Sequence, residues 1–287
     1  MLTFNKSPWT IKPRKWQVCA MEKIFMHLTV TENMPAVVRA VPGAGKSKLI
    51  KHVCDEVHLE SNEVIVISTT FERLVEQLEK DFHKKGYILE DSTKSVGCYY
   101  GKLKQTRQVI ISCNPSLVRL GAELKALGFK VALWIVDECH RTENDSMKAA
   151  AAAALEPRHI LGFSGTPFLS DESKALSLFK VQIYNYSAAQ ALADGVIVPF
   201  RVVPYMGDLR GHMLDDVCIQ MIKGAEGPGV VNAETIEDAE EFANKLNQTT
   251  DYAGYEKEAE AIHSKLETTS RSASKSTVFF KTGRFWK

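Results

Sequence analysis

The segment VVRAVPGAGKSKLI (37–50) restricts the fold most, because it joins a β-branched run to a helical pattern through a glycine-rich turn. Glycines allow a backbone to point its N–H groups inward, and the following helix presents its positive N-terminus to an anion. A lysine adds a charge for the β- and γ-phosphates, and a hydroxyl after it can ligate Mg²⁺. These features predict a nucleotide-binding loop with contacts from Pro42, Gly43, Ala44, Gly45, Lys46, Ser47 and Lys48.

Ala40 stands where the general pattern G-x-x-x-x-G-K-[ST] begins with glycine. A small residue can end a strand there without a positive φ, so alanine is compatible with the loop. The alternative is a glycine-rich turn that holds a lysine by chance. The strand pattern before the turn and the helical pattern after it favour the phosphate-binding loop.

Five apolar runs recur along the chain, at 36–41, 63–68, 108–113, 131–136 and 159–164. Several are apolar at consecutive positions, which is typical of parallel strands covered on both faces. Segments with helical spacing lie between the runs; one has an apolar face made of Leu49, Ile50, Val53, Cys54 and Val57. The alternation predicts an α/β fold with a doubly wound parallel sheet, and an α+β fold places the motifs less coherently.

The run IVDECHR (135–141) ends an apolar strand with two adjacent acids. Ligands of open α/β sheets bind at the carboxyl edge, where the acids and the loop are expected to meet. We expect Asp137 to hold Mg²⁺ together with Ser47, and Glu138 to orient or deprotonate the attacking water. Two solvated acids in a turn are the alternative, which the loop disfavours. Lys46, Asp137 and Glu138 are the predicted catalytic residues of an NTPase.

The overall charge does not indicate a nucleic-acid binder, since 36 Lys+Arg and 35 Asp+Glu leave a formal net charge of +1. A nucleic-acid surface would have to be a local patch. The six cysteines are scattered without a C-x-x-C pair, which predicts reduced thiols rather than disulfides or structural zinc. The chain shows no signal peptide and no apolar run of bilayer length, so a cytoplasmic protein is expected.

The motifs together resemble those of superfamily 2 helicases of the DEAD/DEAH type. A-x-x-G-x-G-K-S (40–47), DECH (137–140) and SGTP (164–167) resemble motifs I, II and III. The segment 186–200 is similar to the end of the first motor domain in DNA translocases related to type III restriction subunits and phage helicases. The resemblance covers residues 14 to about 266. It implies RecA-like domains and an ATP- and Mg²⁺-dependent helicase or translocase. Its partner would be nucleic acid, a single strand or a duplex junction, with DNA favoured over RNA, and its location the host cytoplasm if phage-encoded.

The resemblance also implies roles for residues outside the loop. Gln17 matches the glutamine that contacts the adenine edge. Three residues match a relay from the γ-phosphate to domain movement: His140, Ser164 and Thr166. Motifs Ia and Ib, which grip the backbone of a nucleic-acid strand, correspond here to Thr70, Arg73, Asn114 and Ser116. Helix caps or solvated turn residues are the alternative for each of these four.

The sequence pattern changes near residue 200. We expect a first RecA-like domain at 1–200, part of a second at 201–263 and a basic Ser/Thr-rich tail at 264–287. The second part resembles motif IV at 229–247, but motif V and the arginine-rich motif VI are not found. An arginine finger raises the rate of nucleotide hydrolysis by a factor of about 10³–10⁵, so slow hydrolysis is expected without it. The chain would be a truncated product, a fragment or a subunit completed by another chain.

A second class of function is also compatible with these features. A non-catalytic, nucleotide-gated module for nucleic-acid binding or regulation would use the same loop. Its tail would supply aromatic anchors for single strands at Phe279, Phe280, Phe285 and Trp286. Tails of this composition are also typical of disorder. A P-loop kinase or a transporter ATPase explains neither the SGTP segment nor the likeness to motif IV.

Overall fold

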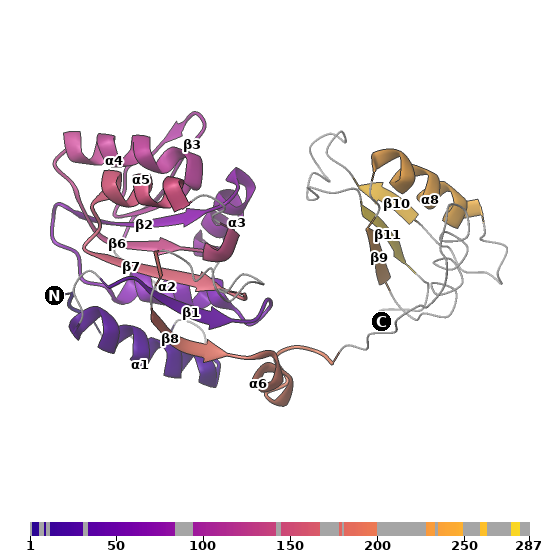
Figure 1. Ribbon diagram of the computed structural model, residues 1–287, viewed down its shortest axis with the longest axis horizontal. Helices are drawn as coiled ribbons and strands as arrows, with labels where there is room; N and C mark the ends of the chain where they lie inside the picture. Colours follow the sequence, from indigo (N-terminus) through magenta and orange to yellow (C-terminus); the bar gives the residue numbers. More distant parts are fainter. Residues whose placement is uncertain are drawn as a thin grey trace. The chain divides into compact units, whose positions relative to one another are not determined.

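The computed structural model describes residues 2–5, 9, 12–30, 34–83, 94–141, 145–166, 178–179, 181–199, 228–232, 235–248, 259–262 and 277–281. The chain divides into two compact units, Met1–Phe200 and Arg201–Lys287 (Figure 1). Pro167 of the SGTP segment and residues 264–276 and 282–287 of the predicted tail lie outside the described residues.

An eight-stranded sheet forms the centre of the first unit, with the strand order β4-β3-β5-β2-β6-β7-β1-β8. Every neighbouring pair except β3 and β4 is parallel. The strands are β1 (Ala36–Ala40), β2 (Glu63–Thr69), β3 (Val96–Tyr100), β4 (Leu103–Lys104), β5 (Val109–Cys113), β6 (Lys130–Val136), β7 (His159–Ser164) and β8 (Val181–Tyr186). The predicted parallel α/β fold and its five predicted strands are confirmed.

Helices cover both faces of this sheet. They are α1 (Lys15–Val30), α2 (Lys46–Glu56), α3 (Glu72–His83), α4 (Leu117–Ala126), α5 (Asp145–Leu155) and the short α6 (Ala188–Ala193), with 3-10 turns at Asn114–Ser116 and Cys139–Arg141. One buried cluster joins the sheet to α1, α2 and α3, and another joins it to α4 and α5. Along β2, Ile65 and Ile67 belong to the first cluster, and Val64 and Val66 to the second. This two-sided burial explains the consecutive apolar residues of the strands.

The helix after the loop begins at Lys46, as predicted, and the five apolar residues expected on one face are all buried. In α3 the buried residues are Val75, Leu78 and Phe82. No disulfide joins the described cysteines, which stand at positions 19, 54, 98, 113 and 139.

The sequence analysis does not predict β3, β4 and β8. β3 (VGCYY) contains glycine and cysteine, and β8 (VQIYNY) is an edge strand with mostly half-buried or exposed residues, so neither forms an apolar run. β8 nevertheless borders the glycine-rich loop, because its parallel pairing with β1 puts Tyr186 beside Ala40.

The second unit contains β9 (Pro228–Asn232), α8 (Ile236–Gln248), β10 (Ala259–Ile262) and β11 (Thr277–Lys281). The three strands form an antiparallel sheet in the order β10-β11-β9. β9 and α8 correspond to the strand and helix of the motif IV-like segment. β11 lies inside the expected tail, so this part of the tail forms strand pairs. A RecA-like sheet is parallel, and the partial second RecA-like domain therefore stays a prediction.

Within the described parts of the chain, every helix is too short or too polar to span a lipid bilayer.

Candidate active site

The glycine-rich loop follows β1 at the carboxyl edge of the sheet and leads directly into α2. Gly43 and Gly45 have φ values of 75° and 95°, which residues with a Cβ atom rarely adopt. Gly45 is the N-cap of α2 and has no side chain with which to cap the first turn. The N–H groups of this turn thus face the loop without a capping side chain, as an anion site at a helix N-terminus requires.

Two residues near the start of α1 hold the carbonyl groups of the loop. Arg14 Nη1 donates to the carbonyl oxygens of Gly43 and Ala44, at 3.2 and 2.6 Å. Trp16 Nε1 donates to the same carbonyl of Ala44 at 3.2 Å. Neither residue is predicted from the sequence, although both lie within three positions of Gln17. Their role depends on a contact between α1 and the loop that the local sequence does not reveal.

Gln17 is buried, and both ends of its amide bind protein atoms. Its Nε2 donates to the carbonyl oxygen of Gly45 at 3.0 Å, and its Oε1 accepts from the backbone N–H of Arg14 at 2.8 Å. Gln17 therefore contacts the phosphate loop itself. The contact with adenine that the resemblance implies stays a prediction.

Lys46 and the acid pair lie on two sides of the same site. Lys46 Nζ is 3.4 Å from Glu138 Oε1 and donates to the carbonyl oxygen of Ala40 at 3.3 Å. Glu138 has a φ of 48°, an uncommon conformation for a residue with a side chain. Asp137 fixes the turn, because its N–H donates to the Ser68 carbonyl at 2.9 Å and its Oδ1 accepts from the Glu138 N–H at 3.0 Å. The parallel sheet thus brings together the loop and the acids as predicted.

The carboxyl group of Asp137 is in an unfavourable place for an isolated charge. Burial raises the pKa of Asp137 to about 6, the charge of Glu138 adds to the rise, and Lys46 opposes it. A divalent cation beside Asp137 would favour the ionised carboxylate. Carboxylate and hydroxyl oxygens are the ligands that Mg²⁺ accepts, so this position suits a metal ligand.

The three residues of the predicted relay lie together. His140 Nδ1 and Ser164 Oγ are 2.7 Å apart, and the N–H of Thr166 donates to Ser164 Oγ at 3.0 Å. His140 Nδ1 also lies 3.4 Å from Glu138 Oε2. Contacts therefore run without a break from Lys46 through Glu138 and His140 to Ser164. That this chain of contacts transmits the presence of a γ-phosphate stays a prediction.

Two predicted nucleic-acid contacts follow neighbouring strands. The register of β2 and β5 pairs Thr69 with Cys113, so Thr70 and Asn114 come next at the carboxyl edge. Thr70 Oγ1 and Asn114 Oδ1 are both buried, and neither has a hydrogen-bond partner among the described residues. Buried polar atoms normally have partners, so these two oxygens are free to accept hydrogen bonds from a ligand. That nucleic acid is this ligand stays a prediction.

The other predicted residues lie in the loop, in α2 and next to the two strands. Pro42 is exposed in the loop, and Ser47 and Lys48 are half-buried in the first turn of α2. Arg73 is exposed on α3. Ser116 is half-buried, with its Oγ 3.4 Å from the sulfur of Cys113.

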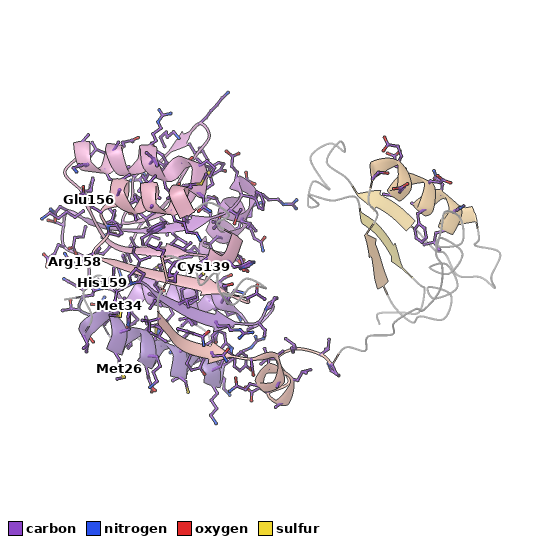
Figure 2. The ribbon with its side chains drawn as sticks, in the orientation of Figure 1. Met26, Met34, Cys139, Glu156, Arg158 and His159 are labelled. Atoms are coloured by element: carbon purple, nitrogen blue, oxygen red, sulfur yellow. The ribbon has the colours of Figure 1, made fainter. Side chains whose placement is uncertain are left out.

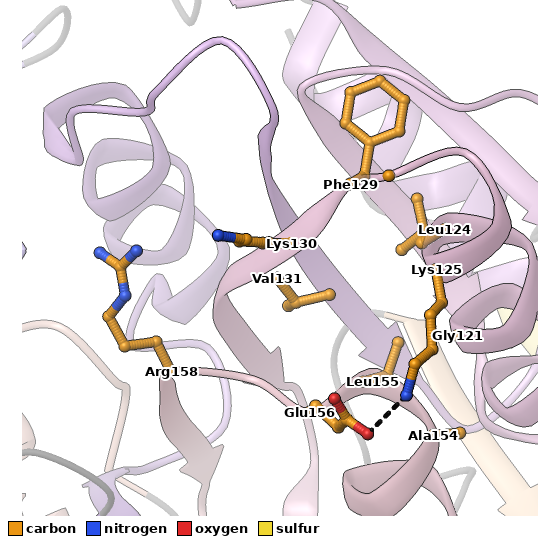
Figure 3. A pocket seen from close by; sticks show the side chains of 11 residues that line it. Gly121, Leu124, Lys125, Phe129, Lys130, Val131, Ala154, Leu155, Glu156 and Arg158 are labelled. Atoms are coloured by element: carbon orange, nitrogen blue, oxygen red, sulfur yellow. Dashed lines mark hydrogen bonds and ion pairs between the residues drawn. The ribbon is translucent and has the colours of Figure 1, made fainter.

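A surface cleft of about 420 Å³ lies at the opposite, amino edge of the sheet (Figure 3). In Figure 2, Glu156 and Arg158 mark this edge, whereas Cys139, directly after the acid pair, marks the other. The cleft lies at the C-terminal ends of α4 and α5. Two of the cations that line it pair with acids: Lys125 with Glu156 at 2.8 Å, and Arg158 with Glu63. Lys125 also lies in the last turn of α4, where a cation complements the helix dipole.

The family model described as SWI2/SNF2 ATPase matches residues 16–223, nearly three quarters of the chain. The chain belongs to the SWI2/SNF2 ATPase family. It is a helicase-type ATPase domain, and the predicted relation to superfamily 2 helicases is confirmed. The matched range contains the phosphate loop, the acid pair and the relay residues.

Individual relatives of this SWI2/SNF2 ATPase domain are distant. It is 22% identical over 223 residues to the type I restriction enzyme SsaAORF53P endonuclease subunit of Staphylococcus saprophyticus. That match covers 74% of this chain and 24% of the subunit, so the chain spans about a quarter of that relative's length.

Two solved structures are similar at 14% identity. A nuclease-deletion mutant of the Type ISP restriction-modification enzyme LlaGI, in complex with a DNA substrate mimic, gives a TM-score of 0.47. The match covers 75% of this chain and 22% of that one. The UvsW helicase of bacteriophage T4 gives a TM-score of 0.43, over 64% of this chain and 63% of that one.

Proposed function

We propose that this SWI2/SNF2 ATPase domain binds Mg²⁺-ATP at the phosphate loop and hydrolyses it to drive movement along nucleic acid, with DNA the favoured substrate. One observation carries the proposal: Lys46 Nζ lies 3.4 Å from Glu138 Oε1. A cation suited to phosphates and a carboxylate suited to water activation, far apart in the sequence, meet at the carboxyl edge of the sheet.

In this proposal the triphosphate competes with Glu138 for Lys46. The N–H groups of Gly43, Gly45, Lys46 and Ser47 bind phosphate oxygens, and Lys46 Nζ moves to the β- and γ-phosphates. Glu138 is then free to orient a water molecule and accept its proton. The water oxygen forms a bond to the γ-phosphorus while the bond from that phosphorus to the β–γ bridging oxygen breaks, so ADP leaves with the bridging electrons.

Ser47 and Asp137 would hold Mg²⁺ in this site. The metal, when bound, neutralises charge that develops on the phosphate oxygens. The raised pKa of Asp137 supports the assignment, because a buried carboxylate beside Glu138 gains from a nearby cation. Asp137 is itself fixed by its hydrogen bonds to the Ser68 carbonyl and the Glu138 N–H, so it offers the metal a rigid oxygen.

The same edge of the sheet supports nucleic-acid binding. The buried oxygens of Thr70 and Asn114 lack partners among the described residues, and Arg73 and Ser116 add a charge and a hydroxyl nearby in the sequence. Hydroxyls, amides and cations suit the sugar–phosphate backbone rather than the bases, so binding would be insensitive to sequence. His140, Ser164 and Thr166 would link this surface to the nucleotide.

The domain is proposed to turn over slowly by itself. After residue 210 the only arginines are Arg271 and Arg284, and neither belongs to a Q-x-x-G-R-x-x-R pattern. Without an arginine finger, the rate of ATP hydrolysis is expected to be lower by a factor of about 10³–10⁵. Another chain or a further part of the protein would complete the second motor unit, and the site of action would be the cytoplasm.

ATP turnover with and without single-stranded DNA or RNA tests the proposal. We expect stimulation by the polynucleotide, lost in both Lys46→Ala and Glu138→Gln. Binding of a fluorescent ATP analogue should be lost only in Lys46→Ala. Lys23→Ala, an exposed lysine of α1, is the matched control and should behave as wild type.

The non-catalytic alternative predicts a different result in the same assays. Tight nucleotide binding without turnover, unchanged by Glu138→Gln, would support the non-catalytic nucleic-acid-binding module and refute the motor.

A further inference from the structure

Trp16 joins two elements that are far apart in the sequence. Its ring stacks on that of Tyr186, with centroids 5.0 Å apart and an angle of 13° between the planes. Its Nε1 donates to the Ala44 carbonyl at 3.2 Å. Both aromatic residues are 2% exposed. One buried indole therefore contacts the phosphate loop through its N–H and the end of β8 through its face.

Tyr186 continues this path. Its hydroxyl donates to Asp194 Oδ2 at 2.8 Å, and Asp194 is the C-cap of α6. Burial and this hydrogen bond raise the pKa of Tyr186 to about 12, so the hydroxyl keeps its proton at neutral pH and remains a donor.

The segment after β8, residues 187–199, is called the connector here, because the second unit begins at Arg201. Ser187 and Gln190 form a capping box at the start of α6. The N–H groups of Val196 and Ile197 both donate to the carbonyl oxygen of Ala191, at 2.8 and 3.3 Å. These bonds make the connector an ordered piece of the first unit.

The orientation of one peptide group explains why Trp16 matters to the loop. In a trans peptide the C=O group and the next N–H group point in opposite directions. No peptide bond of the described residues is cis. Because Trp16 and Arg14 hold the Ala44 carbonyl on their side, the N–H of Gly45 points away from them and is left to bind an anion at the loop.

We propose that Trp16 is a positioning residue that orients the Ala44–Gly45 peptide for ATP and transmits nucleotide binding to the connector through Tyr186 and Asp194. The inference rests on the proposed function, since it requires that ATP binds at this loop. It adds a link between the nucleotide and the segment that leads to the second unit, separate from the relay through His140 and Ser164.

Trp16→Phe tests the hydrogen bond, because phenylalanine keeps an aromatic ring but has no N–H. We expect binding of a fluorescent ATP analogue with Mg²⁺ to weaken about threefold to tenfold, as for loss of one buried hydrogen bond. The KM for ATP should rise by the same factor, while turnover at saturating ATP stays the same. Trp9→Phe is the matched control, because Trp9 stacks on His52 rather than on β8.

Tryptophan emission provides a readout that a purely structural role would not change. ATP should alter the emission of the wild type and of Trp9→Phe, and this response should be smaller in Trp16→Phe, in which Trp134 still emits. Tyr186→Phe, which keeps the stacked ring but loses the bond to Asp194, should reduce the response. If Trp16→Phe does not fold, as judged by thermal unfolding, Tyr186→Phe carries the test, and an unchanged response there would overturn the inference.

The failures of the two proposals can be told apart. If the wild type binds ATP and Trp16→Phe binds it equally well with the same emission response, the inference is wrong and the proposed function stands. If the wild type itself binds no ATP, the proposed function is wrong and the inference falls with it.

Discussion

Glu138 is the residue on which the proposed chemistry depends most. One carboxylate oxygen lies 3.4 Å from Lys46 and the other 3.4 Å from His140. Its backbone is held at a φ of 48° by the turn after β6. A side chain fixed by two charged or polar neighbours and an uncommon backbone conformation is well placed to act as a base as soon as Lys46 turns to the phosphates.

Glu138→Gln should lower the maximal rate of ATP hydrolysis by about 10²–10⁴, the range expected for loss of general-base catalysis. The affinity for ATP should stay the same or rise, because a neutral amide no longer competes for Lys46. Glu156→Gln is a matched control, since Glu156 also has a positive φ of 44° but lies at the amino edge. Steady-state kinetics measure both effects, and a rate reduced less than threefold would contradict a role as base.

Ser164 contacts His140 and Thr166 beside the candidate site, and we do not expect it to take part in the reaction itself. Ser164→Ala removes the partner of His140 Nδ1 and of the Thr166 N–H. We expect stimulation of ATP turnover by single-stranded DNA to fall by about fivefold or more, the lower end of typical coupling energies. The unstimulated rate should change less. Ser61→Ala, at an exposed position, should leave stimulation intact, and equal loss in both variants would argue against the relay.

At the scale of elements, the packing of α4 against α5 depends on a single glycine. A Cβ atom at Gly121 would lie 2.5 Å from the backbone carbon and oxygen of Ala154. Backbone atoms cannot give way as a flexible side chain can, so the two helices would have to move apart. This pair covers one face of the sheet and forms no part of the glycine-rich loop, so we expect a change in its packing to affect stability more than ATP binding.

Gly121→Ala should therefore lower the free energy of unfolding by about 1–3 kcal/mol, as overpacking does. Urea unfolding followed by circular dichroism measures this change. Val118→Ala, at an exposed position on α4, should change stability much less. The affinity for ATP should stay within twofold of wild type in both variants. Normal stability with weakened ATP binding would show that α4 and α5 influence the loop.

The sequence predicts the elements whose signals are local and misses those that depend on the assembled fold. The loop at 42–48 and the acid pair at 137–138 are visible because glycine, lysine and carboxylate chemistry restricts both positions. The central strands are visible because burial on two faces demands apolar runs. Trp16 and β8 are not visible, since the first acts through α1 contacts and the second is an edge strand with alternating exposure.

At the scale of the whole molecule, the first unit contains both its own core and the complete candidate site. Both large buried clusters of the described residues consist of side chains between Leu2 and Ala191. The loop, the acids, the relay and the two unpartnered oxygens also lie before residue 200. Because the apolar surface that stabilises the sheet is buried within this unit, the second unit is not needed for the first to fold.

Residues 1–200 alone should consequently unfold cooperatively and bind a fluorescent ATP analogue with Mg²⁺ within about twofold of the 287-residue chain, since domains with their own core fold alone. The same piece carrying Lys46→Ala should unfold similarly but not bind. DNA-stimulated turnover should be weaker than in the full chain, because movement on nucleic acid requires a second unit to close on the nucleotide. Failure of residues 1–200 to fold, or a tenfold loss of affinity, would mean that the second unit contributes directly to the nucleotide site.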